Sequence, residues 1–366
     1  MRPIKHIIKG LFFIIHGVSL FVLIPLSAQD DTTTVKTDST DSKKTILDLT
    51  QSSRKIEGMF TFFQDTVNGS VQMLIKENQL NKEYIHFVHS LDGVVDVGYF
   101  RGAYKSSKIF EIRKYFNRLE FVSINTAYYF DPENPLSRAE SANINAAVLA
   151  TLSISATDDK TGAMLLSVDD MFLSENLYQI KPSPNPEVKP GTRFSLGSLN
   201  KNKCQYIALN NYQLNSDVII KYVYDNPNPI NRGGPGITDP RAVHMVIQHS
   251  FIAVPDSDYN PRYDDPRVGY FMTQVTDLTS TSNTPYRDLI HRWKLIKKEP
   301  SAPISEPVEP IIFWIENTTP TEFRPAVKEG VLRWNRAFRA AGFKDAIQVR
   351  VQPDAAEWDA GDIRYN

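Results

Sequence analysis

The sequence has almost no cysteine with which to form stabilising disulfides, because Cys204 is its single cysteine. A lone thiol forms no disulfide within the chain, so the fold must rely on packed cores or on metals. Two interpretations of Cys204 stay open. It is either a pro-segment thiol that ligates and silences a zinc ion in the same polypeptide, or a half-buried strand residue that behaves as a small hydrophobe. We favour the second, because no recognisable inhibitory motif surrounds the cysteine.

The sequence also lacks an excess of charge of either sign. It has 41 basic and 42 acidic residues, for a formal net charge of −1. No overall field therefore draws the chain to nucleic acid or to anionic lipid, and we expect no nucleic-acid partner. With 366 residues, 41% of them hydrophobic, the chain has enough apolar material for about two or three packed domains.

Several catalytic motifs are absent as well. The sequence contains no G-x-S-x-G elbow, no Cys/His pairing and no H-E-x-x-H. Residues 231–241, "NRGGPGITDPR", are rich in glycine but lack the lysine and the Ser/Thr of a phosphate-binding loop. We expect residues 231–241 to form a loop, and we assign no catalytic residue.

The histidines show no pair at the spacing of metal ligands. His86 and His89 are three apart in a stretch that alternates like a strand, which places their rings on opposite faces. His244 and His249 are five apart and also face opposite ways on a strand. We therefore expect all four to be structural.

The densest polar cluster lies in residues 256–271. Asp256, Asp258 and Asn260 alternate like the first ligands of a calcium loop, but Arg267 stands where such a loop needs a bidentate glutamate. A proline also stands where the loop needs glycine. We expect a rigid surface turn in which arginines pair with neighbouring aspartates.

The first 48 residues have the character of a targeting segment and a leader. Residues 1–28 combine a positive start, an apolar run and a small residue at Ala28, which predicts a cleaved signal peptide. An uncleaved membrane anchor is the alternative, although a His-Gly pair interrupts the apolar run. Residues 29–48 are polar and predict a disordered leader. The mature protein is therefore expected to be exported, to the periplasm, the cell surface or the medium, with membrane contact only through the signal.

The middle of the chain has the pattern of short strands. Runs rich in Phe, Val, Ile and Tyr alternate with turn signals such as Asn68-Gly69. We expect a small β-rich module at 49–97 and a larger one at 98–297, with one helical interruption at 137–155. Residues 298–310, which are rich in proline, predict an extended linker and a domain boundary.

Residues 311–366 have a different pattern. "IIFWIE" predicts a buried strand, and "TPTE" at 319–322 predicts a capping box at the start of a helix. Pro325 predicts a short first turn and then a kink. The helix ends at Gly342, "AIQVRV" predicts a second strand and "DIRYN" the beginning of a third. The apolar face expected to contact a sheet consists of Phe323, Val327, Val331, Trp334, Phe338 and Ala341.

This C-terminal stretch resembles the opening of the catalytic domain in large secreted bacterial zinc-dependent metallopeptidases of the metzincin type. That family carries a "G-x-x-x-W-N-x-A-F-x-x-A-G-F" signature on its first long helix. The upstream region also looks like the two non-catalytic modules that precede the protease, with "DDPRVGYF" and "HRWKLIKKEP" among the closest matches. The resemblance covers roughly residues 49 to 366. The signature positions are Gly330, Trp334, Asn335, Ala337, Phe338, Ala341, Gly342 and Phe343.

The resemblance implies a complete protein that hydrolyses peptide bonds in a peptide or protein substrate. Three histidines would hold a zinc ion, with one position open for water and a glutamate to take the proton. These residues have no counterpart in the 366 residues, so we expect the chain alone to bind no zinc and to be inactive. It would be the N-terminal portion of an exported zinc-dependent metallopeptidase.

The expected fold class is α+β, with β-rich modules followed by an incomplete strand-helix-strand-strand opening of a metzincin-like α/β catalytic domain. A second hypothesis gives the β-rich modules a role without catalysis. They would act as a chaperone or inhibitor of a separate protease, or bind a surface polymer. The oligomeric state stays open.

Overall fold

The computed structural model describes residues 44–359 and 361–365. The expected signal peptide, 1–28, and most of the expected leader lie outside the described residues. Within the described part, no helix is both long enough and apolar enough to span a membrane. The last residues assigned to the leader are ordered, because helix α1 (Ile46–Thr50) begins there with a capping box between Thr45 and Asp48.

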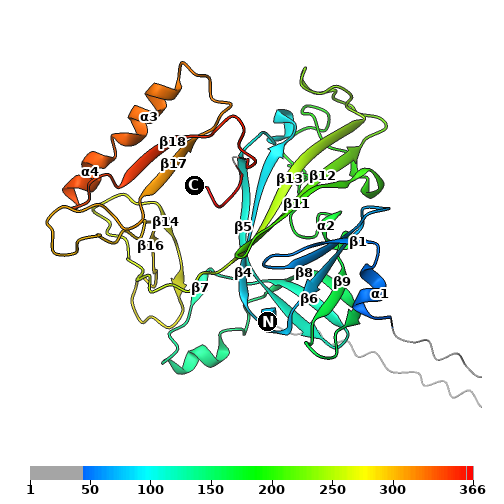
Figure 1. Ribbon diagram of the computed structural model, residues 1–366, viewed down its shortest axis with the longest axis horizontal. Helices are drawn as coiled ribbons and strands as arrows, with labels where there is room; N and C mark the ends of the chain where they lie inside the picture. Colours follow the sequence, from blue (N-terminus) through cyan, green and yellow to red (C-terminus); the bar gives the residue numbers. More distant parts are fainter. Residues whose placement is uncertain (1–43, 360, 366) are drawn as a thin grey trace, which may run out of the picture. The chain divides into compact units, whose positions relative to one another are not determined.

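Most strands belong to one antiparallel sheet of twelve strands (Figure 1). The order is β1-β2-β3-β9-β8-β6-β5-β4-β13-β12-β10, and β11 also pairs with β12. We call these twelve strands the β unit. Their bounds are β1 Ser53–Ile56, β2 Thr61–Asp65, β3 Val71–Ile75, β4 Glu83–Asp92, β5 Ala103–Tyr115, β6 Arg118–Ser123, β8 Ala147–Thr157, β9 Met164–Ser167, β10 Ser198–Leu199, β11 Gln205–Asn211, β12 Asn215–Asp225 and β13 Ala242–Ala253.

One hydrophobic core lies against this sheet, because alternate side chains of each strand point the same way. In β3, for example, Val71, Met73 and Ile75 are fully buried while Gln72 is only partly covered. The short helix α2 (Asp169–Phe172) adds two further buried side chains, Met171 and Phe172. The largest fully buried side chains are Tyr222, Tyr224, Phe60, Phe62, Phe121, Phe172, Phe251, Met73, Ile75, Ile112, Leu119 and Met164.

The two β-rich modules expected from the sequence share this core. Strand β4 lies in the first expected module, yet it pairs with β5 and β13 of the second. The hydrophobic cluster likewise joins Phe62 and Met73 to Phe121 and Ile247. The structure thus places residues of both ranges, 49–97 and 98–297, in one sheet and one core.

The helix expected at 137–155 is wrong. The stretch contains a 3-10 turn, η3 (Pro135–Ala139), and most of strand β8. Ala150 and Leu152 are buried while Thr151 and Ser153 are exposed, which is the period of a strand. Pairing with β6 and β9 on both sides decides the conformation here, and it overrides the helical preference of alanine.

The remaining described elements are short. Two small sheets pair β14 (Met272–Thr273) with β16 (Leu289–Ile290), and β15 (Thr276–Asp277) with β7 (Tyr128–Tyr129). Three further 3-10 turns are η1 Glu77–Gln79, η2 Val95–Val97 and η4 Lys201–Lys203.

Strand β17 (Ile311–Ile315), helices α3 (Arg324–Leu332) and α4 (Asn335–Ala340), and strand β18 (Ile347–Val351) form a parallel βαβ arrangement. We call residues 311–351 the βαβ unit. The fold class is therefore β-rich with a smaller helical part, which confirms the expected α+β class at that level.

Three details of the C-terminal expectation are wrong. The helix begins at Arg324 without a side-chain cap, and its break lies between Leu332 and Asn335 rather than at Pro325, which occupies the first helical turn. The third strand predicted from "DIRYN" is not found, because its described residues, 362–365, form a turn instead. In this turn the amide of Tyr365 donates to the carbonyl of Asp362.

The proline-rich stretch 298–310 is not an extended spacer. Ser305 is buried, its amide donates to the carbonyl of Gly342, and its carbonyl accepts from Lys344. The stretch also forms a bridge between Lys297 and Pro307. It therefore packs beside the end of α4 and belongs structurally with the βαβ unit.

Candidate functional site

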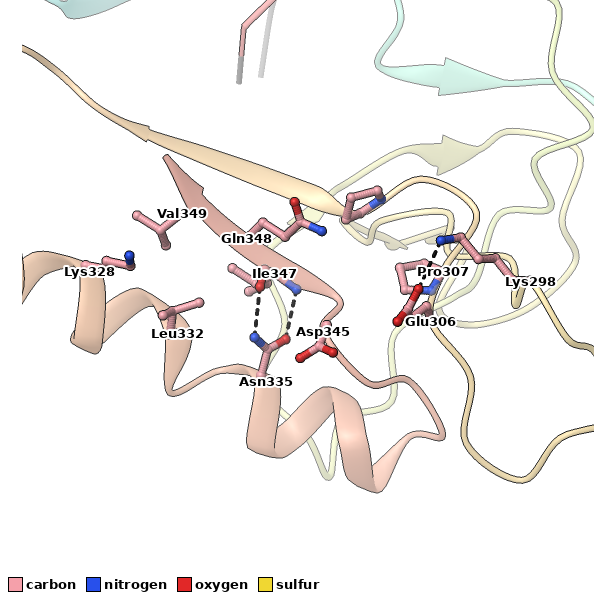
Figure 2. A pocket seen from close by; sticks show the side chains of 11 residues that line it. Lys298, Glu306, Pro307, Lys328, Leu332, Asn335, Asp345, Ile347, Gln348 and Val349 are labelled. Atoms are coloured by element: carbon pink, nitrogen blue, oxygen red, sulfur yellow. Dashed lines mark hydrogen bonds and ion pairs between the residues drawn. The ribbon is translucent and has the colours of Figure 1, made fainter. Parts of the chain in front are cut away.

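Asn335 of the signature links helices α3 and α4 to the sheet of the βαβ unit through two hydrogen bonds. Its Nδ2 donates to the carbonyl of Ile347 at 2.8 Å, and its Oδ1 accepts from the amide of Ile347 at 2.8 Å (Figure 2). These two backbone groups lie on the edge of β18 that faces away from β17. The carboxamide thus replaces one pair of strand hydrogen bonds at an otherwise unpaired edge.

Gly342 and Phe343 of the signature end helix α4 through a Schellman motif. The amide of Gly342 donates to the carbonyl of Arg339, and that of Phe343 donates to the carbonyl of Phe338. Gly342 has a φ of 90°, a conformation that L side chains rarely adopt. An added Cβ would also lie 3.0 Å from the carbonyl oxygen of Pro303. Ala341 is the C-cap residue of the same helix end.

Of the other four signature residues, Phe338 is partly buried and the remaining three are exposed. Gly330 is exposed, and a Cβ there would meet no atom within 4 Å. Trp334 is 65% exposed, and Ala337 is exposed as well. Nothing in the described chain explains why these three positions carry glycine, tryptophan and alanine.

The apolar face expected to contact a sheet lies largely in the open. Phe323 and Val327 are 59% and 42% exposed, and no residue of α3 or α4 is buried. The side chains that face β18 are instead Lys328, Leu332 and Asn335 (Figure 2). Val331 and Phe338 of the same face are partly buried, so the described chain covers only part of the face that was expected to contact a sheet.

A pocket of 480 Å³ lies between these helices, β18 and the 298–310 stretch. Its lining includes four charged side chains, those of Lys298, Glu306, Lys328 and Asp345. Lys298 Nζ binds Glu306 Oε2 at 3.0 Å, and this bond holds the pKa of Glu306 below its ordinary value (Figure 2). The ammonium and the carboxylate of this pair therefore neutralise each other. The pocket holds no nucleophile with an adjacent base.

Each of the four histidines lies on the face of its strand that the alternation of side chains predicts. His86 is 1% exposed in the core, whereas His89 points to the opposite face of the sheet; His249 is likewise in the core and His244 points outward. Among the described residues, no three His, Cys, Asp or Glu side chains come together as a set of metal ligands. The described residues therefore do not fit the zinc ion that the resemblance implies, and we assign none of them to it.

A buried chain of hydrogen bonds, which was not predicted from the sequence, crosses strands β4, β13 and β12. His86 Nε2 lies 3.0 Å from His249 Nδ1, and His249 Nε2 lies 2.9 Å from the hydroxyl of Tyr222. That hydroxyl donates to the carbonyl of Phe172 at 2.7 Å. Only the register of β4 against β13 brings the two histidines together, and no spacing in the sequence signals it.

The geometry of these hydrogen bonds determines which ring nitrogens of the two histidines carry a proton. Because Tyr222 donates to Phe172, it accepts from His249 Nε2, and His249 Nδ1 then accepts from His86 Nε2. Burial holds the pKa of His86 well below its ordinary value and lowers the pKa of His249 to about 3. Both rings are therefore neutral at physiological pH, and the chain is a structural element of the core.

Cys204 is half-buried and packs against the main core at the start of β11. Burial raises the pKa of its thiol. A protonated, packed thiol fits the interpretation of Cys204 as a small hydrophobe.

The loop that resembled a calcium site is held by ion pairs. Arg267 binds Asp265 through two nitrogens, and Lys294 pairs with Asp258. The expected turn with arginine–aspartate pairing is therefore found. The glycine-rich stretch 231–241 is a loop, as expected, and the amide of Gly234 donates to Asp96 at 2.8 Å.

Comparison with known proteins gives one match. The family model described as "Domain of unknown function (DUF5117)" matches residues 104–298. The matched range comprises most strands of the β unit and ends before β17. No curated protein and no solved structure matches the chain.

Proposed function

The chain belongs to the DUF5117 family, and because the function of that family is unknown, we propose a role from the chain's own residues. It is the N-terminal, non-catalytic portion of an exported zinc-dependent metallopeptidase. In this proposal the β unit is a scaffold, and the βαβ unit is the first part of the catalytic domain.

The observation that carries the proposal is the placing of the signature residues. Asn335 binds the free edge of β18, and Gly342 and Phe343 close the helix against the preceding stretch. A strand, a helix and a parallel strand in this order are what the resemblance to metzincin-type peptidases implies. The signature thus supports the opening of an α/β sheet rather than any chemistry.

The exposed side of the helix pair supports the same proposal. Phe323, Val327 and Trp334 are large apolar side chains with more than two-fifths of their surface open to solvent. Contiguous exposed apolar residues mark surfaces that other polypeptide covers. A sheet that continued beyond β17 and β18 would bring more polypeptide to this helix pair.

The chemistry of the proposed enzyme would come from residues beyond those described. When bound, a zinc ion held by three histidines would polarise the peptide carbonyl and activate water. The described residues would only position the catalytic sheet, so we derive no catalytic step from them.

The test is to isolate the protein as the source cell exports it, with an antibody against the β unit. Its mass, its zinc content and its cleavage of a denatured protein would be measured, with and without a zinc chelator. The 366-residue chain, of 41.6 kDa, is the control. We expect a heavier product with about one zinc per molecule and chelator-sensitive cleavage. A product no larger than the control, without zinc and without cleavage, would overturn the proposal and favour a non-catalytic role.

A further inference from the structure

The face of the β unit opposite the core carries buried polar side chains on strands β4, β13 and β12. His89 lies beside Gln248 in the register of β4 and β13, and Ser250 lies beside Asp217 in the register of β13 and β12. All four are at most 4% exposed. Polar side chains on the outer face of a sheet are normally solvated, so something must cover them.

The cover is formed by Asp359 and residues 361–365 near the C-terminus, which we together call the strap. In Figure 1 it is the end of the red segment that follows β18. Gln248 Nε2 donates to the carbonyl of Gly361 at 3.1 Å. Gly361 lies directly on the imidazole of His89, since a Cβ added to this glycine would fall 1.8 Å from His89 Nε2. Any larger residue at this position would require His89 or the strap to shift.

Charged groups hold both sides of the strap. Arg364 lies 3.5 Å above the ring centre of Tyr212 and binds Asp362 at 2.6 Å. Arg101, in the connection between β4 and β5, binds Asp359 of the strap at 2.9 Å. Arg101 also binds Glu316, which follows β17, at 2.7 Å. The strap and this arginine therefore join the βαβ unit to the β unit.

Three atoms under the strap oppose its docking. His89 Nδ1, His89 Nε2 and Asp217 Oδ1 are buried and have no hydrogen-bond partner among the described residues. Buried polar atoms without partners are unfavourable, because they have given up hydrogen bonds to water. Lifting the strap would return water to all three atoms. These atoms lower the stability of the docked strap.

We propose that the outer face of β4, β13 and β12 is a peptide-docking site that the strap occupies reversibly in cis. A glycine against His89, an acidic residue against Arg101 and an arginine over Tyr212 define the segment that it accepts. The docked strap holds the βαβ unit on the β unit, and the lifted strap frees it. This inference does not rest on the proposed peptidase, and its test uses neither zinc nor proteolysis.

The histidines provide the measurement. Acylation of imidazoles by diethyl pyrocarbonate, mapped by mass spectrometry, reports which rings solvent reaches. In the full chain His244 and His291 are exposed and should react, whereas His86 and His249 are in the core and should not. His89 should react slowly, at the rate set by lifting of the strap.

The decisive variant is Gly361→Ala, and its matched control is Gly236→Ala. A Cβ at 361 meets His89, whereas a Cβ at 236 meets no atom within 4 Å. We expect acylation of His89 to rise roughly tenfold or more in Gly361→Ala and to stay unchanged in the control. Unreactive His86 in both variants would show that the core is intact.

A peptide of residues 356–365 supplied in trans completes the test. It should protect His89 again in the Gly361→Ala chain, and the same peptide with alanine at the glycine position should not. Three results would overturn the proposal. Fast acylation of His89 in the unaltered chain would mean that the strap does not dock, and continued protection of His89 in Gly361→Ala would mean that the strap is not its cover. Failure of the glycine peptide to protect His89 would also overturn it, because the face would then be no docking site.

Discussion

The β unit and the βαβ unit use similar apolar side chains to different effect. In the β unit Phe60 and Phe62 are fully buried in one continuous core. In the βαβ unit no helical residue is buried, and Trp334 is 65% exposed. A fully buried side chain of this kind contributes about 1.5–3 kcal/mol. The helices forgo most of that contribution, because two strands and one short stretch cannot enclose them.

An amphipathic pattern therefore indicates that a helix needs a packing partner, and not that the partner is present in the same chain. The helix of the βαβ unit has strong apolar periodicity, yet within the described chain it turns polar residues such as Lys328 and Asn335 toward β18. Its order depends on a few specific bonds, above all those of Asn335. The β unit depends instead on many interchangeable packing contacts, and the two regions should respond differently to substitution.

The largest expected effect is on the core of the β unit. Phe62→Ala should lower the free energy of unfolding by about 3–5 kcal/mol, because it opens a cavity in a closely packed core. Phe323→Ala, at a similarly large residue of the βαβ unit, should change it by about 0.5 kcal/mol or less. Urea unfolding followed by circular dichroism would measure both. Equal losses of unfolding free energy in the two variants would contradict this expectation, since Phe323 would then be part of a closed core.

The second expectation concerns acid. His86 and His249 stay neutral in the folded β unit because burial lowers their pKa values, whereas in the unfolded chain they take up protons below about pH 6.5. The unfolded state then binds more protons, so the free energy of unfolding falls as the pH drops through 6.5. The urea midpoint should decrease steadily from pH 7.5 to pH 5. The exposed His244→Gln variant should keep the same slope, and a flat profile would show that the pair carries no such linkage.

A smaller and local effect is expected at Asn335. Asn335→Ala removes both bonds to Ile347 and should destabilise the βαβ unit by about 1–3 kcal/mol while leaving the β unit unchanged. Amide exchange of β18 should accelerate and that of β12 should not. Arg336→Ala, at an exposed neighbouring position, is the control. Faster exchange in both strands would mean that the two units unfold together.

The smallest effect is expected under the strap. Burial raises the pKa of Asp217 to about 6, so the folded state binds more protons than the unfolded state between about pH 4 and 6. The charge therefore opposes folding above pH 6. Asp217→Asn should raise the free energy of unfolding at pH 7 by about 1 kcal/mol or less, because the carboxamide has one acceptor oxygen fewer than the carboxylate that binds Asn215, which offsets part of the gain. At pH 4 the gain should vanish, and a gain of equal size at both pH values would contradict this origin.

Much of the β unit could be predicted from the sequence. The runs that became β4, β11 and β12 alternate clearly, and Asn68-Gly69 marks the turn between β2 and β3, where Gly69 has a φ of 76°. Strand β8 was missed because its alanines favour a helix locally, and only pairing with β6 and β9 makes it a strand. One core across both expected modules could not be foreseen either, since it depends on which strands are neighbours.

The candidate sites were likewise predictable from the sequence only in part. The helix stop at Gly342 was predictable, because glycine after an amphipathic run ends a helix by local geometry. The His86–His249 pair and the strap over His89 were not predictable, because each joins segments more than 100 residues apart. In the sequence, Gly361 is one glycine among 17, and nothing near it shows that an imidazole lies against it.

The most direct test of the contrast between the two units is hydrogen exchange of the mature chain, read by mass spectrometry at neutral pH. The account predicts that amides of β4, β12 and β13 exchange only with global unfolding of the β unit. Amides of α3 and α4 should exchange within seconds, because no buried side chain holds these helices. If α3 and α4 proved as protected as β12, the βαβ unit would be a finished domain with its own closed core, and the account would be wrong.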